Sequence, residues 1–183
     1  MNESQNPSAL RSKQVIMDAL LKLMEDHPYS EISVKQIVLE TDLVRKTFYR
    51  NYSSKDDVLE AYINMKVYEY TEALLDQPDP LTVIFEFCDN NRKMLELLHK
   101  NDMMYMLLVR LNEIIPRLNE TTDMERNPFK KLIGELEPDY LIAFNVGAIW
   151  NVIAKWVERG MEEPLDDVKN VLAQYIARLN PPS

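Results

Sequence analysis

The chain has 183 residues, of which 46% are hydrophobic and 28% charged, an ordinary composition for a folded globular protein that argues against disorder. Its three glycines and long stretches without proline favour helix. The formal net charge of −9 speaks at first sight against a nucleic-acid partner. No apolar run approaches the ~20 residues that cross a bilayer, and the segment from Met1 to Pro7 lacks a secretion signal. We therefore expect a cytoplasmic protein without a membrane span.

The first predicted helix begins near Ser8. It places four apolar residues at positions i, i+3, i+4 and i+7, which form a single face: Ile16, Ala19, Leu20 and Leu23. The helix should stop before Asp26-His27-Pro28, because proline disfavours helical geometry in the residue that precedes it.

Two short helices are predicted next. Ser33 and Gln36 form an S-x-x-Q capping box, in which each side chain satisfies a free backbone amide at the start of the second helix. Asp42 suits the corner that follows, because aspartate tolerates turn geometry. The third helix should cover roughly 44–51, with Phe48 and Tyr52 four residues apart and turned inward.

Ser54 and Asp57 form a second capping sequence, which opens a long helix to about Leu75. Further helices are predicted near 81–98, 101–118, 128–136, 138–160 and 164–179, and no strand pattern of useful length appears. The expected fold is all-α. A three-helix helix-turn-helix domain (8–53) is joined through the long helix to a helical dimerisation and effector-binding domain (54–183).

Charge is distributed unevenly along the chain. The segment from Ile32 to Lys55 carries five basic residues against two acidic ones, a local balance of +3, whereas residues 61–183 carry 13 basic and 20 acidic residues, a balance of −7. An acidic body repels DNA everywhere except at one basic segment, which is a way to fix the orientation of binding.

The third helix has the side chains that a major-groove reader requires. The groove is about 12 Å wide and admits one helix, whose exposed face must carry donors for phosphates and base edges. With Phe48 and Tyr52 inward, Arg45, Lys46, Tyr49 and Arg50 are left to face outward. Lys55, in the first turn of the next helix, is a candidate for clamping a phosphate.

At these residues the sequence resembles the TetR family of transcriptional regulators. The matching motifs are Ile32-Ser33-Val34-Lys35-Gln36-Ile37, Lys46-Thr47-Phe48-Tyr49-Arg50-Asn51-Tyr52 and Ser54-Lys55-Asp56-Asp57-Val58-Leu59. The resemblance covers about the first third of the chain. It implies a symmetric dimer whose recognition helices enter successive major grooves of a near-palindromic operator. We expect the following residues to contact DNA: Ser33, Lys35, Arg45, Lys46, Thr47, Tyr49, Arg50, Asn51 and Lys55.

Three positions depart from the family pattern. Asp42 stands where a turn glycine is usual, Val44 replaces the small polar residue that commonly caps the third helix, and Lys46 replaces a glycine inside it. Loss of a cap costs ~1 kcal/mol. The added lysine at 46 offers a further phosphate or base contact.

The C-terminal pattern, Asp139 to Trp150 and Lys155 to Met161, is similar to a branch of the same family that includes activators of dihydroxyacetone-kinase operons. This likeness implies that the last two helices pair with their symmetry mates in a four-helix bundle. Small and apolar residues on one helix face permit a close approach of a partner helix. The expected dimer-interface residues are Phe144, Gly147, Ala148, Asn151, Val168, Leu172 and Tyr175.

Other candidate sites are weaker. Met103, Tyr105, Met106 and Trp150 suggest an adaptable apolar lining for a ligand, although ordinary core packing is the favoured interpretation. Cys88 is expected to be a buried small hydrophobe. The two histidines lack the spacing of a metal site, and no nucleophile-base pair or phosphate loop indicates an enzyme, so we expect no metal, no cofactor and no catalysis.

Two functions are consistent with the sequence. The first is a DNA-binding transcription regulator, more often a repressor than an activator in this family, that acts as a homodimer and responds to a small apolar molecule. The second is a similar regulator controlled by a protein partner instead of a metabolite.

Overall fold

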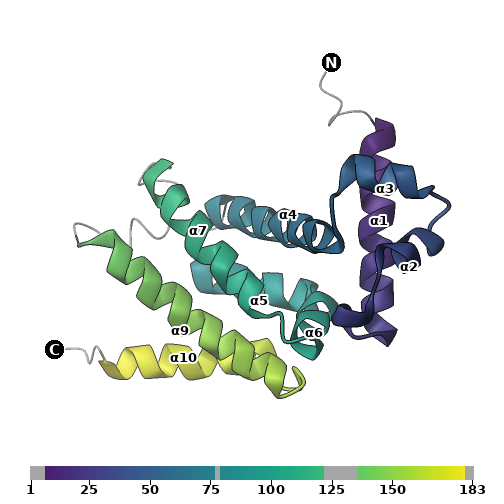
Figure 1. Ribbon diagram of the computed structural model, residues 1–183. Helices are drawn as coiled ribbons and strands as arrows, with labels where there is room; N and C mark the ends of the chain where they lie inside the picture. The colour runs from purple at the N-terminus through teal and green to yellow at the C-terminus, as the bar shows by residue number, and fades with distance from the viewer. Residues whose placement is uncertain (1–6, 77–78, 122–135, 180–183) are drawn as a thin grey trace. The chain divides into compact units, whose positions relative to one another are not determined.

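The computed structural model describes residues 7–76, 79–121 and 136–179, and within these ranges all regular structure is helical (Figure 1). The expected all-α class is therefore confirmed. The chain divides into two compact units between Lys66 and Val67, inside one long helix. The expected domain boundary between residues 53 and 54 stays a prediction.

The first unit is built on helix α1 (Pro7–Asp26). The predicted apolar face is buried as a set: Ile16, Ala19, Leu20 and Leu23. Proline at position 28 ends the helical region, and a short 3₁₀ turn, η2 (Tyr29–Glu31), leads to the next helix. Helices α2 and α3 both pack against α1, so this apolar face organises the unit.

Helix α2 (Val34–Leu39) begins at the predicted capping box. The Ser33 amide donates to the Gln36 side chain at 2.9 Å, and the Gln36 amide donates to Ser33 Oγ at 3.3 Å. In the turn that follows, Thr41 rather than Asp42 makes the stabilising bonds. Its hydroxyl donates to the Val38 carbonyl at 2.9 Å and accepts from the Leu43 amide at 3.1 Å.

Helix α3 (Arg45–Asn51) starts at Val44, which makes no side-chain cap bond. Helix α4 (Lys55–Asp76) starts at the second predicted capping sequence. Ser54 Oγ accepts from the Asp57 amide at 3.1 Å, and Asp57 accepts from the Ser53 amide at 2.8 Å. The bonds from the Ser53 amide and the Ser54 hydroxyl lower the pKa of Asp57, which keeps this carboxylate charged at the positive end of the helix.

In the described residues of the second unit, the end of α4 is followed by α5 (Pro80–Asn90), α6 (Arg92–Lys100), α7 (Tyr105–Thr121), α9 (Pro138–Glu158) and α10 (Leu165–Leu179). The single helix expected at 81–98 is wrong, because Asn91 has φ −122° and ψ 26° and separates α5 from α6. The Asn91 side chain donates to the Phe87 carbonyl at 2.8 Å, a local bond that competes with helix propagation. The helix expected at 128–136 lies almost wholly outside the described residues.

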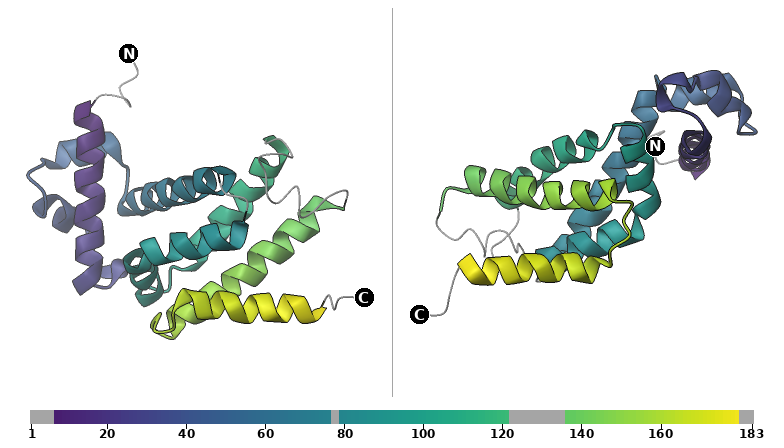
Figure 2. Two further views of the ribbon diagram at one scale, coloured as in Figure 1. Left: turned by 180° about the vertical axis from the view of Figure 1, so that it is seen from behind. Right: turned by 90° about the horizontal axis from the view of Figure 1, so that it is seen from below.

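Helix α9 packs along α7 and also contacts α6, while α10 packs on α5 (Figure 2). The turn between α9 and α10 is tied to α6: Arg92 donates to the Met161 carbonyl at 2.9 Å and lies 4.8 Å from the Trp156 ring. The Trp156 indole N–H donates to the Glu163 carbonyl at 2.8 Å across the same turn. These bonds fix the direction in which α10 leaves α9.

Helix α9 bears on the expectation that the chain has no membrane span. Helix α9 is long and apolar enough, by length and composition alone, to cross a membrane. Its apolar residues are interrupted by Asn145 and Asn151, so a search for uninterrupted runs overlooks it. Core helices have the same composition, and α9 buries one face against α6 and α7.

Candidate DNA-binding surface

Helix α3 is anchored by aromatic side chains. Phe48 is fully buried and Tyr52 nearly so, with their ring centroids 6.3 Å apart, as the sequence predicted. Burial raises the pKa of Tyr52 to about 12, so this phenol stays neutral at physiological pH. The two rings fix the rotation of α3 about its axis, and with it the direction of the remaining side chains.

The opposite face of α3 is exposed. Arg45, Lys46, Tyr49 and Arg50 all lie on it. Arg45 Nη2 donates to the Tyr49 hydroxyl at 3.2 Å, and its guanidinium lies 5.4 Å from the centroid of the same ring. Tyr49 therefore restrains the Arg45 side chain, which reduces the conformational entropy that Arg45 loses on binding.

The remaining residues predicted to contact DNA differ in their exposure and in the hydrogen bonds that their side chains already make. Lys35 is exposed on α2, and Thr47 is half-buried. Asn51 donates to the Thr47 carbonyl at 2.8 Å, so its amide stabilises the end of α3. The Ser33 hydroxyl is likewise engaged in the capping box, where it donates to the Gln36 side chain at 2.7 Å. The Ser33 amide and carbonyl are also engaged, with the Gln36 side chain at 2.9 Å and the Ile37 amide at 3.1 Å.

Lys55 has partners that the sequence did not indicate. Its ammonium group donates to the Tyr29 and Ile32 carbonyls at 2.6 and 2.7 Å and approaches the Ser30 carbonyl at 3.4 Å. The ammonium also lies 4.4 Å from the centre of the Tyr29 ring. Sequence reasoning missed this role for Tyr29, because residues 26 positions apart leave no periodic signal.

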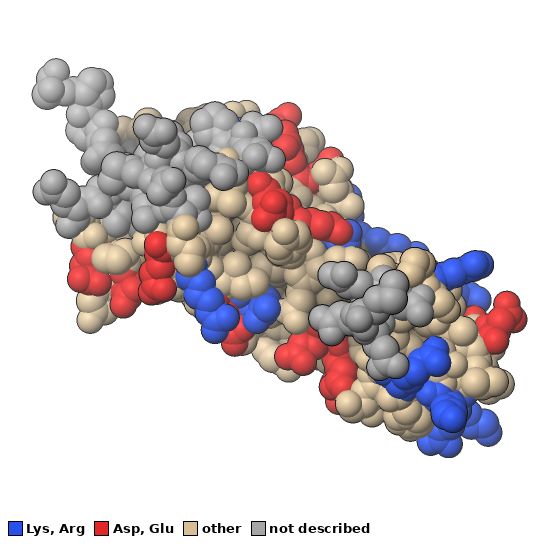
Figure 3. Space-filling view, turned by 90° about the horizontal axis from the view of Figure 1, so that it is seen from above, with Lys and Arg blue, Asp and Glu red and all other residues tan. Residues whose placement is uncertain are grey.

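Figure 3 shows where charge gathers on one face of the molecule. Several Lys and Arg side chains cluster on the unit that carries α1 to α3, whereas Asp and Glu are frequent on the other unit. Acidic side chains are also visible on the unit that carries α1 to α3, so its basic character is confined to a patch. The basic face is the part of the surface that suits a polyanion.

The predicted dimer residues lie on outward faces of α9 and α10. Phe144 is 71% exposed and Tyr175 60% exposed, and Ala148 and Asn151 are exposed along the same α9 face as Phe144. Val168 and Leu172 are half-buried. Gly147 has open space where a Cβ would stand, with no described atom within 4 Å outside its neighbours and the nearby backbone of its own helix. The described fold by itself therefore does not require glycine at this position.

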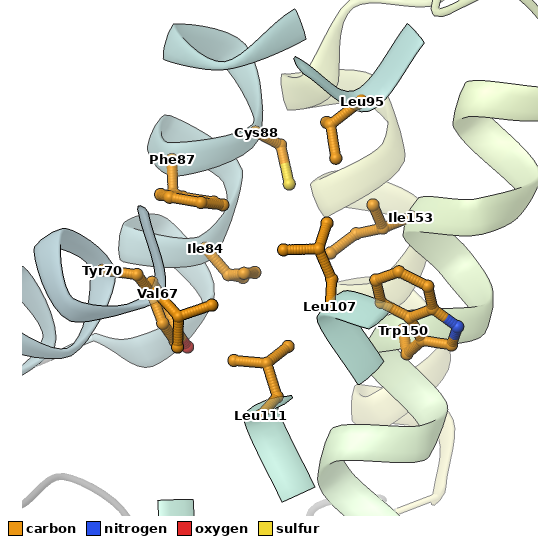
Figure 4. A pocket seen from close by; sticks show the side chains of 10 residues that line it. All are labelled: Val67, Tyr70, Ile84, Phe87, Cys88, Leu95, Leu107, Leu111, Trp150 and Ile153. Atoms are coloured by element: carbon orange, nitrogen blue, oxygen red, sulfur yellow. The ribbon is translucent and has the colours of Figure 1, made fainter. Parts of the chain in front are cut away.

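A small apolar cavity lies inside the second unit (Figure 4). Its volume is about 20 Å³, and its lining comes from five helices: Val67, Tyr70, Ile84, Phe87, Cys88, Leu95, Leu107, Leu111, Trp150 and Ile153. Of the four predicted ligand residues, Trp150 lines this cavity, whereas Met103, Tyr105 and Met106 do not, and Tyr105 points outward with 60% exposure.

Cys88 is buried and free, as expected. Burial raises the pKa of its thiol to about 12, so the reactive thiolate is not populated near neutral pH. The cavity wall at Cys88 is therefore chemically inert.

The family comparison agrees with this geometry. Residues 16–62 match the family model described as "Bacterial regulatory proteins, tetR family". The matched range begins within α1, contains α2 and α3, and ends within α4. None of the curated protein sequences compared with the chain matches it.

Solved structures with the same fold cover nearly the whole chain. A TetR transcriptional regulator from Streptococcus agalactiae 2603V has a TM-score of 0.63 and 19% identity over 90% of this chain and 92% of its own. The dihydroxyacetone kinase operon activator DhaS has a TM-score of 0.60 and 19% identity, over 90% and 96%. The fatty acid degradation regulator FadR from Bacillus halodurans has a TM-score of 0.57 and 20% identity, over 91% and 93%.

The chain thus has the fold of a TetR-family transcriptional regulator. Its N-terminal part, residues 16–62, is similar to the part of that family which the family model describes, and it contains the helix pair α2 and α3.

Proposed function

We propose that the protein is a sequence-specific DNA-binding transcriptional regulator that acts as a homodimer in the cytoplasm. The observation that carries this proposal is the exposed face of α3. Arg45, Lys46 and Arg50 project from a helix whose orientation is fixed by the buried Phe48. Such a helix suits the major groove, where arginine and lysine donate to guanine and to phosphates. Repression is the mode expected from the family resemblance.

The test is a gel shift against the promoter region beside the protein's own gene. Binding should be saturable and should weaken steeply with salt, because each phosphate contact releases counterions. Absence of salt-sensitive binding across several candidate operators would contradict the proposal. A reporter gene placed behind a bound operator then distinguishes repression from activation.

Replacing Arg45 or Lys46 with alanine is expected to weaken operator binding by ~1–3 kcal/mol if the residue reads a base. Both side chains are exposed, so the variants should melt at the same temperature as the wild type. Fluorescence anisotropy with labelled operator measures the affinity. Lys93→Ala, at an exposed lysine on α6, is the matched control and should bind normally. Unchanged affinity in both α3 variants would remove these residues from the reading face.

The homodimer is proposed on the outward faces of α9 and α10. Exposed aromatic residues next to small ones, with open space at Gly147, suit a tightly packed helix pair from a second copy. A second copy also covers the apolar surface that makes α9 hydrophobic on two faces.

We further propose that a small apolar effector acts on the second unit. The cavity has wholly apolar surroundings apart from the polar groups of Tyr70, Cys88 and Trp150. At about 20 Å³ it has room for roughly one water molecule. An effector must therefore displace the lining helices, and it regulates DNA binding only by its difference in affinity between two states.

Effector binding is expected to change the fluorescence of Trp150, which lines the cavity. The matched control is Trp150→Phe, which should abolish the change while the second tryptophan, Trp156, still reports folding. Screening medium-chain apolar acids and alcohols at micromolar to millimolar concentration provides the measurement. A fluorescence change that survives in Trp150→Phe would place the effector elsewhere.

A second candidate is regulation by a protein partner. One solved structure with this fold is named as an operon activator and another as a regulator of fatty acid degradation, so neighbours with the same fold carry different assignments. The cavity in this chain is too small to hold an effector unless its lining helices move, and this supports regulation by a protein partner as the alternative. Purification from the native host separates the two: a stoichiometric protein partner supports the second candidate, and a copurified small molecule the first.

A further inference from the structure

Lys55 occupies a carbonyl cradle, defined here as the backbone oxygens of Tyr29, Ser30 and Ile32. Two of its interactions are good hydrogen bonds at 2.6 and 2.7 Å, and the third is longer at 3.4 Å. An ammonium group has three donors and no acceptor. All three donors therefore point into the protein, toward the loop between α1 and α2.

A second interaction joins the same two segments. The Tyr29 hydroxyl donates to the Asp56 carboxylate in the first turn of α4. Tyr29 is 7% exposed, and its side chain is held by Lys55 at the ring and by Asp56 at the hydroxyl. Ile32 is 2% exposed and directly precedes Ser33, the N-cap of α2. The cradle therefore connects the start of α4 to the point from which α2 begins.

We propose that Lys55 is a positioning residue, which holds the start of the helix-turn-helix against the start of α4, and not a ligand of DNA phosphate. This inference rests on the proposed DNA binding. A phosphate contact requires the ammonium to leave hydrogen bonds to carbonyls that already occupy its three donors. The compact ammonium fits three converging carbonyls, whereas the planar fork of a guanidinium does not.

The experiment compares Lys55→Arg, Lys55→Met and wild type, with Lys22→Arg as the matched control. Lys22 is exposed and pairs with Glu40 at 2.6 Å, and Lys22→Arg should behave like the wild type. Operator affinity is measured at low temperature over a range of salt concentrations, after circular dichroism has shown that each variant is folded. Amide hydrogen exchange over residues 29–39 is measured in the absence of DNA.

If Lys55 is a positioning residue, Lys55→Arg weakens operator binding about tenfold, the effect of one charge-assisted hydrogen bond, with an unchanged salt slope. Lys55→Met weakens binding similarly, and hydrogen exchange at residues 29–39 rises in both variants.

If Lys55 instead binds phosphate, Lys55→Arg has wild-type affinity, and Lys55→Met lowers the salt slope by about 0.9 for each phosphate that is no longer neutralised. That result overturns the inference, as does unchanged hydrogen exchange in both variants. Wild-type protein that binds no operator contradicts the proposed function instead, and hydrogen exchange still tests the cradle.

Discussion

Phe144→Glu is expected to convert the protein into a monomer and to weaken operator binding at least ~100-fold, because two linked reading heads gain about 10²–10⁴ in avidity over one. Phe144 is 71% exposed on the α9 face that we assign to the dimer. A two-fold interface contains the substituted residue of both copies, so it would bury two like-charged carboxylates. The monomer loses the gain in avidity.

The matched control is Val109→Glu. Val109 is a similarly exposed apolar residue, 52% exposed on α7 in the same unit, and the substitution changes the net charge by the same amount. Light scattering coupled to size-exclusion chromatography measures the mass, and fluorescence anisotropy measures the affinity. We expect Val109→Glu to remain dimeric and to bind normally. A Phe144→Glu variant that keeps both the dimer mass and wild-type affinity would show that α9 is not the interface.

Phe48→Ala is expected to destabilise the first unit by ~3–5 kcal/mol, the usual cost of removing a fully buried aromatic ring. Phe48 is 0% exposed and lies against both Tyr49 and Tyr52, with ring centroids 5.4 and 6.3 Å away. Loss of the ring leaves a cavity at the helix that we propose reads DNA. Since whole domains are stable by only ~5–15 kcal/mol, operator binding should fail near physiological temperature.

Urea denaturation followed by circular dichroism measures this effect. Phe48→Leu keeps most of the apolar volume and should cost markedly less than Phe48→Ala. Tyr49→Phe, at the half-exposed neighbour, should leave stability within about 0.5 kcal/mol and remove only the bond from Arg45. Equal stability of Phe48→Ala and wild type would contradict the anchoring role of this ring.

Local signals in the sequence were sufficient for much of the first unit. The 3.6-residue spacing of apolar residues located α1, and the two capping sequences located the starts of α2 and α4, because a cap depends on residues three positions apart. The inward direction of Phe48 and the exposure of Arg45 followed from the same periodicity.

Interactions between distant residues were decided only by the tertiary structure. The sequence placed Lys55 at the first turn of α4 but did not reveal that the Tyr29 and Ile32 carbonyls surround it. It also did not predict the break at Asn91, where a side chain competes for a helix carbonyl, or which side chains line the cavity beside Trp150. Helix periodicity reports which face of a helix is apolar, whereas the partner of that face depends on how several helices pack together.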